Sequence, residues 1–273
     1  MKILIAADME GITGVVNWDQ VTPGHAEYAR FRRLMTADIN AAIRGAFDAG
    51  ADEVVVADGH WNGSNVVIEE LDPRARLCYG SPSPLSMMEG IDTGVDGVFF
   101  IGYHARAGSQ NAILDHTWSD VRVANVWLNS VLVGEFGLNA AVAGYFGAPV
   151  IMISGDQTAC AQTSELLGPL EMAVVKQARA RFAAECLTPP EAQEQIAQSA
   201  RRAVERLSEG DAPEPYVVDA PVTVTVEFRQ SDMADRASRL PGSQRAGLRV
   251  AFSSPDMILA YQSFRAAVSL AAG

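Results

Sequence analysis

The chain has 273 residues, 48% of them hydrophobic, which suits one large domain or one domain with a smaller companion. Its formal net charge of −12 argues against a partner nucleic acid or an anionic membrane, because both need a basic face, and it suits a site that attracts cations. Three widely spaced cysteines indicate neither a disulfide framework nor a thiolate zinc site. Since the N-terminal apolar run is too short for a signal peptide and no stretch approaches the roughly 18 apolar residues of a membrane span, we expect a cytoplasmic protein.

Short apolar segments alternate with helical patterns through the first part of the chain. Strands are predicted at 2–7, 53–57, 76–79 and 95–103, and helices at 26–49 and 64–71. Because these strands are apolar on both faces, the pattern favours an α/β fold with a mostly parallel sheet covered by helices on both faces.

The second part of the chain begins with the same alternation and then changes. Strands are predicted at 122–129, 131–135, 149–154 and 171–176, and helices at 136–146, 156–167 and 190–207. A short polar linker is predicted at 210–215. In residues 222–228 apolar and polar side chains alternate strictly, as in an antiparallel strand with one solvent-exposed face. Residues 247–252 are its expected partner strand, and 254–272 form a closing helix. We therefore expect an α/β domain at 1–209. Residues 210–273 should form a smaller α+β part, a β-hairpin plus a helix, that packs on this domain.

Polar side chains follow three of the predicted strands. Asp8 and Glu10 end the first strand, and since residues i and i+2 of a strand point the same way, both carboxylates project to one side. Asp58 and His60 end the second strand, and His104 ends the fourth. In open α/β sheets ligands bind at the carboxyl ends of strands, so we expect a site there.

Carboxylates gathered together are costly unless a cation neutralises them, and the mixed nitrogen and oxygen donors suit Zn²⁺, and less well Mn²⁺ or Co²⁺. A carboxylate can bridge two ions, so a two-metal site is possible, and Glu135, placed where a strand turns into a helix, is a further candidate. His116 fits either an acid–base role beside the metal or a structural hydrogen bond. Asp58 could act as a metal ligand, orient His60 or cap a turn. For His25, helix capping or solvent exposure is favoured.

Several motifs together resemble a known family. They are "DMEGITG", "DGH", "GYHARAG", a histidine about a dozen residues further on, and "GEFGLNA", with "LMTADIN", "AGYFGAPVIMISGDQ" and "DMILAYQSF" continuing the likeness along most of the chain. This ordered set is similar to the zinc-dependent D-aminopeptidases that accompany dipeptide-transport operons.

The resemblance implies a catalytic domain with two Zn²⁺ ions per chain. By position, Asp8 would bridge the ions, Glu10 and His60 would complete the ligands of one, and His104 and Glu135 those of the other. His116 would be the catalytic residue near the scissile bond.

The expected reaction is release of an N-terminal D-residue from short D-peptides such as D-Ala-D-Ala. The resemblance also implies a homo-oligomer, a homodecamer of two stacked five-membered rings. A metal-dependent amidase or deacylase acting on another small amide is one alternative, and it would use the same ligands. The other is a non-catalytic, ring-forming peptide-binding protein, which would tolerate loss of His116 and of metal.

Overall fold

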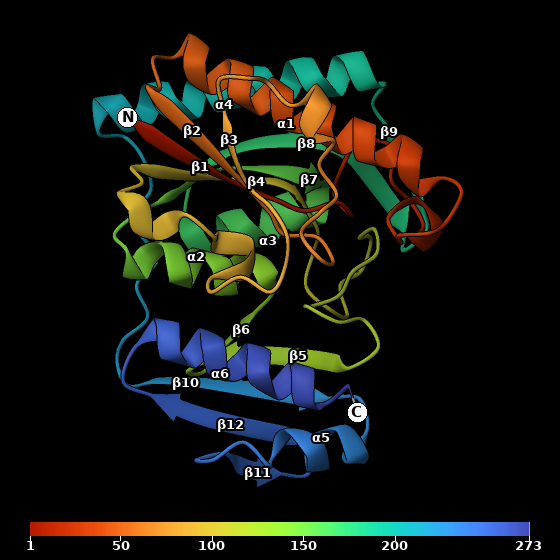
Figure 1. The fold of residues 1–273 in the computed structure, drawn as a ribbon, viewed down its shortest axis with the longest axis vertical. Helices are drawn as coiled ribbons and strands as arrows, with labels where there is room; N and C mark the ends of the chain where they lie inside the picture. Colours follow the sequence, from red (N-terminus) through yellow and green to blue (C-terminus); the bar gives the residue numbers. More distant parts are fainter. Residues whose placement is uncertain (273) are drawn as a thin grey trace.

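The computed structural model describes residues 1–272 and contains two β-sheets with helices packed against them (Figure 1). Gly273, the last residue of the expected C-terminal part, lies outside this range. Within it, no helix has both the length and the apolar character needed to cross a membrane.

The larger sheet has seven strands in the order β3-β2-β1-β4-β7-β8-β9. All neighbouring strands are parallel except the last pair, β8 and β9. The strands are β1 (Lys2–Ala7), β2 (Glu53–Asp58), β3 (Arg76–Cys78), β4 (Gly97–Tyr103), β7 (Val150–Asp156), β8 (Glu171–Ala180) and β9 (Ala183–Cys186). The expected α/β class with a mostly parallel sheet is confirmed.

Helices cover both faces of this sheet because successive residues of its strands point to opposite sides. Ile3 and Ile5 of β1 pack into the hydrophobic cluster beneath α1 (Tyr28–Asp48) and α4 (Pro189–Glu209). Leu4 of β1 packs into the cluster on the other face, with α2 (Glu135–Tyr145), and α3 (Gln157–Leu167) follows β7. Figure 1 shows α1 and α4 on one side of the sheet and α2 and α3 on the other.

The smaller sheet is antiparallel, in the order β11-β12-β10-β5-β6. Its strands are β5 (Val123–Leu128), β6 (Val131–Val133), β10 (Val222–Phe228), β11 (Gln244–Ala246) and β12 (Arg249–Ser254), accompanied by α5 (Ser231–Ala237) and α6 (Met257–Leu270). Two of the five strands, β5 and β6, therefore come from before residue 210. One hydrophobic cluster runs from Leu4 of the large sheet through α2 to Val224 of β10 and Phe264 of α6, so the two sheets share a core.

The structure differs from the expected elements in a few places. The helix expected at 64–71 is wrong: the Asp58 carboxylate accepts the amide hydrogens of Asn65 and Val66, so only a single 3₁₀ turn forms, at Ile68–Glu70. The strand expected at 171–176 continues to Ala180 and turns back as β9, which was not expected, and neither were α5 and β11. The second strand of the pair around Asn129 ends at Val133, and Glu135 begins α2.

Candidate metal centre

Three strand ends converge because β1 lies between β2 and β4 in the large sheet. Asp8 and Glu10 follow β1, His60 follows β2 and His104 follows β4. The two oxygens of Asp8 face different histidines: Oδ1 lies 3.2 Å from His60 Nδ1, and Oδ2 lies 3.4 Å from His104 Nε2. Glu10 Oε2 lies 3.1 Å from His60 Nδ1. Segments far apart in the sequence thus bring two carboxylates and two imidazoles to one place.

Two glycines let the loop after β1 approach the end of β4 this closely. The Gly11 amide donates to the Gly102 carbonyl at 2.7 Å, and a Cβ on Gly11 would lie only 2.0 Å from the Tyr103 carbonyl oxygen. Gly102 has a φ of +76°, and a Cβ there would lie 2.3 Å from the Asp8 carbonyl oxygen. Side chains at either position would push Asp8 and His104 apart.

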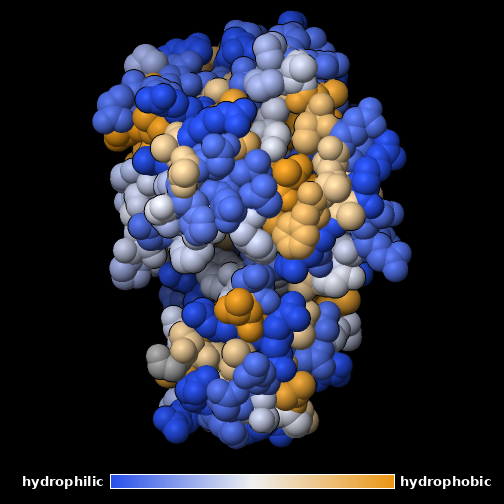
Figure 2. All heavy atoms as spheres, turned by 90° about the vertical axis from the view of Figure 1, so that its right-hand side faces the viewer, coloured by the Kyte–Doolittle hydropathy of each residue, from blue (hydrophilic) through white to orange (hydrophobic). Residues whose placement is uncertain are grey.

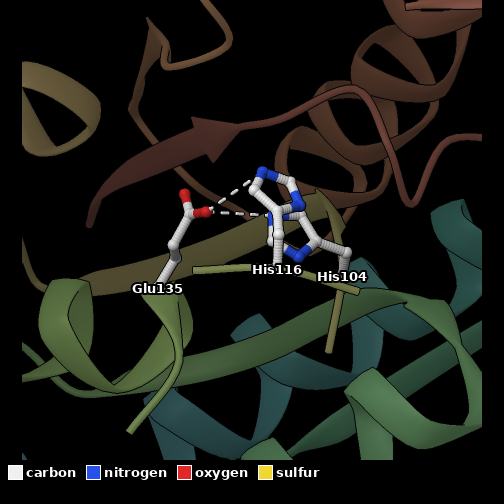
Figure 3. A group of neighbouring side chains, drawn as sticks. All are labelled: His104, His116 and Glu135. Carbon is white, nitrogen blue, oxygen red and sulfur yellow. Dashed lines mark ion pairs between the residues drawn. The ribbon is translucent and has the colours of Figure 1, made fainter. Parts of the chain in front are cut away.

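Glu135 and His116 join the cluster from other elements. Glu135, the first residue of α2, places Oε1 3.1 Å from His104 Nε2 and 3.6 Å from His116 Nε2, while Oε1 also accepts the Trp118 amide at 2.6 Å. His116 Nε2 lies 3.9 Å from Glu10 Oε1. The His104 and His116 rings stack with centroids 3.9 Å apart, and Figure 3 shows Glu135 pointing at both.

Each imidazole is oriented by a backbone carbonyl on its outer side. His60 Nε2 lies 2.7 Å from the Val21 carbonyl, His104 Nδ1 3.0 Å from that of Ala105, and His116 Nδ1 2.8 Å from that of Leu114. A carbonyl only accepts, so in each ring this outer nitrogen carries the hydrogen. When neutral, each ring therefore turns a lone pair toward the carboxylates, as histidine ligands of metals do.

The cluster has acceptors without donors, which is the pattern a cation satisfies. All six side chains are buried, and three of their atoms have no hydrogen-bond partner: Asp8 Oδ2, Glu10 Oε2 and His104 Nε2. Donor atoms of Asp8, Glu10 and His104 lie within 4.8 Å of one another, and so do those of His104, His116 and Glu135. Buried lone pairs that face one another are unfavourable without a positive charge between them, and two imidazole-and-carboxylate sets fit Zn²⁺.

The charges of the cluster shift its protonation strongly. Burial and the adjacent Glu10 raise the pKa of Asp8 to about 7. Burial opposes a charged His104, but Glu135 and Asp8 outweigh it and raise the pKa of His104 to about 10. Burial and the stacked His104 lower the pKa of His116. Without a cation the acids hold a proton on His104, whereas His116 stays neutral.

The cluster opens into a cavity of about 690 Å³. Residues near the strand ends of the large sheet line one part of it, and residues of α6 line another. Asp8, Glu10, His60, His116 and Glu135 all line it. Its wall includes three non-glycine residues with positive φ angles, Trp61, Ser86 and Trp118. Backbone strain of this kind gathers at binding sites, where the surrounding structure holds it in place.

Two of the sequence candidates lie outside the cluster. The Asp58 carboxylate turns to the loop after β2, where it accepts from the Asn65 side chain at 2.8 Å and the Val66 amide at 2.8 Å. It therefore holds the loop that carries His60. His25 is half exposed and lies 3.1 Å from Asp19, in agreement with the expectation of solvent exposure.

Lys176 was not predicted from the sequence to belong to the site, yet it contacts the backbone of the loop that carries Glu10. Its side chain is 1% exposed, and Nζ donates to the carbonyl oxygens of Glu10, Ile12 and Val15 at 2.7, 2.9 and 2.8 Å. These carbonyls belong to the loop after β1, so the lysine fixes the backbone that presents Glu10. The available signal was compositional: Lys176 is one of only two lysines in the chain and lies in a buried strand.

The fold and this cluster together define an α/β metalloenzyme with its centre at the carboxyl edge of a parallel sheet. A family model described as D-aminopeptidase, peptidase family M55, matches residues 1–266. The chain belongs to this family.

Two similar proteins cover nearly the whole chain. A D-aminopeptidase of Bacillus subtilis is 37% identical in an alignment of 273 positions that covers 99% of this chain and 98% of that protein. The structure of a zinc-dependent D-aminopeptidase from Bacillus subtilis, described as a self-compartmentalizing protease, matches with a TM-score of 0.95 and 35% identity, covering 100% of this chain and 98% of the other.

Proposed function

We propose that this protein is a D-stereospecific aminopeptidase that uses two zinc ions per chain to release N-terminal D-residues from short D-peptides such as D-Ala-D-Ala. The observation that carries the proposal is a set of three buried atoms that have no hydrogen-bond partner among the described residues, Asp8 Oδ2, Glu10 Oε2 and His104 Nε2, in a group of residues whose ligand atoms lie within 4.8 Å of one another. Membership in the D-aminopeptidase family and the similarity to a zinc-dependent D-aminopeptidase support it.

Asp8 would hold both ions. Its two oxygens face His60 and His104 separately, which suits a bridging carboxylate. Glu10 and His60 would complete the protein ligands of one ion, and His104 and Glu135 those of the other. When bound, the ions supply Lewis-acid polarisation of the scissile carbonyl and increase the acidity of water.

His116 is the proposed catalytic residue. Its Nδ1–H donates to the Leu114 carbonyl, so Nε2 keeps its lone pair, and the side chain lines the cavity beside Glu135 and Glu10. Because burial and His104 lower its pKa, His116 is neutral near pH 7 and can accept a proton at Nε2 and return it to the leaving amine. Trp18 packs edge-on against the ring at 5.4 Å and limits its rotation.

We further propose that the protein works as a homo-oligomer, the homodecamer that the family resemblance implies. Large hydrophobic side chains are exposed on the single chain, among them Phe182 and Val217 at 52% and 66%. Figure 2 shows patches of hydrophobic residues on one face of the larger part, among hydrophilic surroundings. Burying such patches between copies would stabilise an assembly.

The test is release of free D-alanine from D-Ala-D-Ala by zinc-loaded protein, with L-Ala-L-Ala run in parallel. We expect turnover of the D-peptide alone, loss of turnover on chelation, and recovery on adding zinc, with two zinc ions per chain by elemental analysis. Two bound ions without turnover of either dipeptide would move the assignment to an amidase of another small amide. Absence of bound metal would refute the centre itself.

The role of His116 has a separate test. His116→Ala should lower kcat by about 100-fold or more, as expected for loss of a general acid–base group, and leave two zinc ions bound. His25→Ala is the matched control, because that imidazole lies at the surface. Full turnover by His116→Ala with both metals bound would contradict the assignment.

A further inference from the structure

Two arginines line the cavity on the side of the smaller sheet. Arg122 immediately precedes β5 and Arg265 lies on α6, whereas the candidate metal ligands come from the strand ends of the large sheet and from α2. Figure 1 shows α6 and β5 on the side of the molecule opposite the large sheet. The cavity thus has an acidic wall that suits metal and a second wall that carries cations.

Arg265 is fixed by backbone carbonyls rather than by an acid. Its two terminal nitrogens donate to the carbonyl oxygens of Pro84 and Ser83 at 2.7 and 3.0 Å, so the guanidinium is held in one place. These contacts are with neutral groups, so the positive charge is not cancelled. A guanidinium has five N–H donors, and the carbonyls use only part of that capacity.

Arg122 is fixed at its backbone and free at its side chain. Its amide donates to the Ser119 carbonyl at 3.3 Å and its carbonyl accepts from the Arg229 amide at 2.9 Å. Among residues 1–272 its guanidinium has no hydrogen-bond or ion-pair partner, although Asp120 lines the same cavity. Most other arginines of the described chain, for example Arg206, pair with acids at the surface.

Two arginines that line one cavity and have no acidic partner in the described part of the chain favour an anionic ligand group, and a carboxylate is the group whose geometry a guanidinium fork matches. A short peptide carries such a group at its C-terminus. An extended dipeptide spans about 7 Å, so both of its ends fit within a cavity of this size.

We propose that Arg122 and Arg265 form the recognition site for the free C-terminal carboxylate of the substrate, which makes the enzyme selective for di- and tripeptides with an unblocked C-terminus. The inference rests on the proposed function, because the peptide bond must lie at the metal centre for its far end to reach the arginines. Each added residue moves the carboxylate about 3.3–3.6 Å further away. Longer or C-terminally amidated peptides would therefore lose this contact.

The experiment compares kcat/KM for D-Ala-D-Ala with that for its C-terminal amide, D-Ala-D-Ala-NH₂, in the zinc-loaded protein. We expect the wild-type protein to prefer the free acid by about 10- to 100-fold, the range of a charge-assisted hydrogen bond. Arg122→Gln and Arg265→Gln should each reduce this preference by about tenfold, mainly through KM. Arg239→Gln is the matched control, since Arg239 is exposed and does not line the cavity.

The possible outcomes separate the two proposals. Equal turnover of acid and amide by the wild-type protein would overturn the carboxylate site and leave the aminopeptidase function intact. A preference for the acid that survives both arginine substitutions would overturn the assignment to these residues. If neither compound is cleaved while a blocked or unrelated amide is, the proposed function has failed rather than the recognition site alone. If Arg265→Gln unfolds because Ser83 and Pro84 lose their donors, Arg122→Gln decides, since its side chain holds no other part of the described structure.

Discussion

Replacing Lys176 by methionine tests whether the buried ammonium holds the loop that presents Glu10. Methionine keeps the unbranched shape of the lysine side chain as far as Cε and removes the ammonium group with its charge and its three donors. The carbonyl oxygens of Glu10 and Val15 would then lose the lysine as their partner inside the protein, and that of Ile12 would keep only the Val15 amide. We expect a less stable protein whose first strand-end loop no longer holds its shape.

The magnitude follows from two opposing terms. Each hydrogen bond from the charged ammonium contributes about 1.5–3 kcal/mol, so the loss of all three costs about 6 kcal/mol. Burial lowers the pKa of Lys176 from 10.5 to about 8, and this shift corresponds to about 3 kcal/mol that the charged form costs at neutral pH. Removing the ammonium recovers that cost. The net loss of unfolding free energy is therefore about 3 kcal/mol, which for a chain of 273 residues lowers Tm by about 5 °C.

The assay is chemical denaturation of metal-free protein together with zinc content of the loaded form. Lys2→Met is the matched control, since Lys2 is the only other lysine and its ion pair with Glu53, 3.3 Å long, lies at the opposite end of β1. That control should lose about 1 kcal/mol or less and keep both zinc ions. We expect Lys176→Met to bind less zinc at the Glu10 position. A variant within about 1 kcal/mol of wild type, with full zinc content, would refute the reasoning.

The remaining predictions concern the cluster and its neighbours. Because the acids raise the pKa of His104 from 6.5 to about 10 in metal-free protein, that pairing stabilises the fold fully below pH 6.5 and the stabilisation disappears as the pH rises through 10. Metal-free protein should therefore lose stability over this pH range relative to zinc-loaded protein. Over the same range zinc should bind more tightly and its binding should release protons, which calorimetry in buffers of different ionisation enthalpy measures. Zinc binding without proton release would contradict this. Gly11→Ala should abolish zinc binding, because its Cβ would meet the Tyr103 carbonyl oxygen at 2.0 Å, and an unchanged metal content would show that the loop tolerates the shift. Asp58→Asn should cost about 2 kcal/mol in urea denaturation while keeping both zinc ions, because its carboxylate holds a loop rather than a metal. Loss of a zinc ion in this variant, as expected for Glu10→Gln, would make Asp58 a ligand.

The sequence by itself determined the α/β class and the position of the polar strand ends. Strand periodicity is local, so the apolar run before Asp8 and the i, i+2 spacing to Glu10 could be recognised without the fold. The convergence of His60 and His104 on Asp8 followed from the rule that ligands bind at the carboxyl ends of parallel strands. The strand-to-helix change at Glu135 was equally visible as a change of periodicity.

Only the tertiary structure decided where the non-local contacts fall. Asp58 has the same spacing from His60 as Asp8 has from Glu10, yet its carboxylate faces the amides of its own loop. His116 follows a long connection after β4, and the fold stacks its ring on His104 and places Nε2 3.6 Å from Glu135 Oε1. Lys176 reaches a loop 166 residues away in sequence.

The strand pairing of the smaller sheet could likewise not be predicted from the sequence. β5 pairs with β6 on one side and with β10, about a hundred residues later, on the other, so neither composition nor a linker at 210–215 reveals this partner. Strand pairing and side-chain direction in loops depend on which donors and apolar faces meet in the folded chain. Local sequence fixes what each segment can do, and the packing of distant segments decides which of those options the molecule uses.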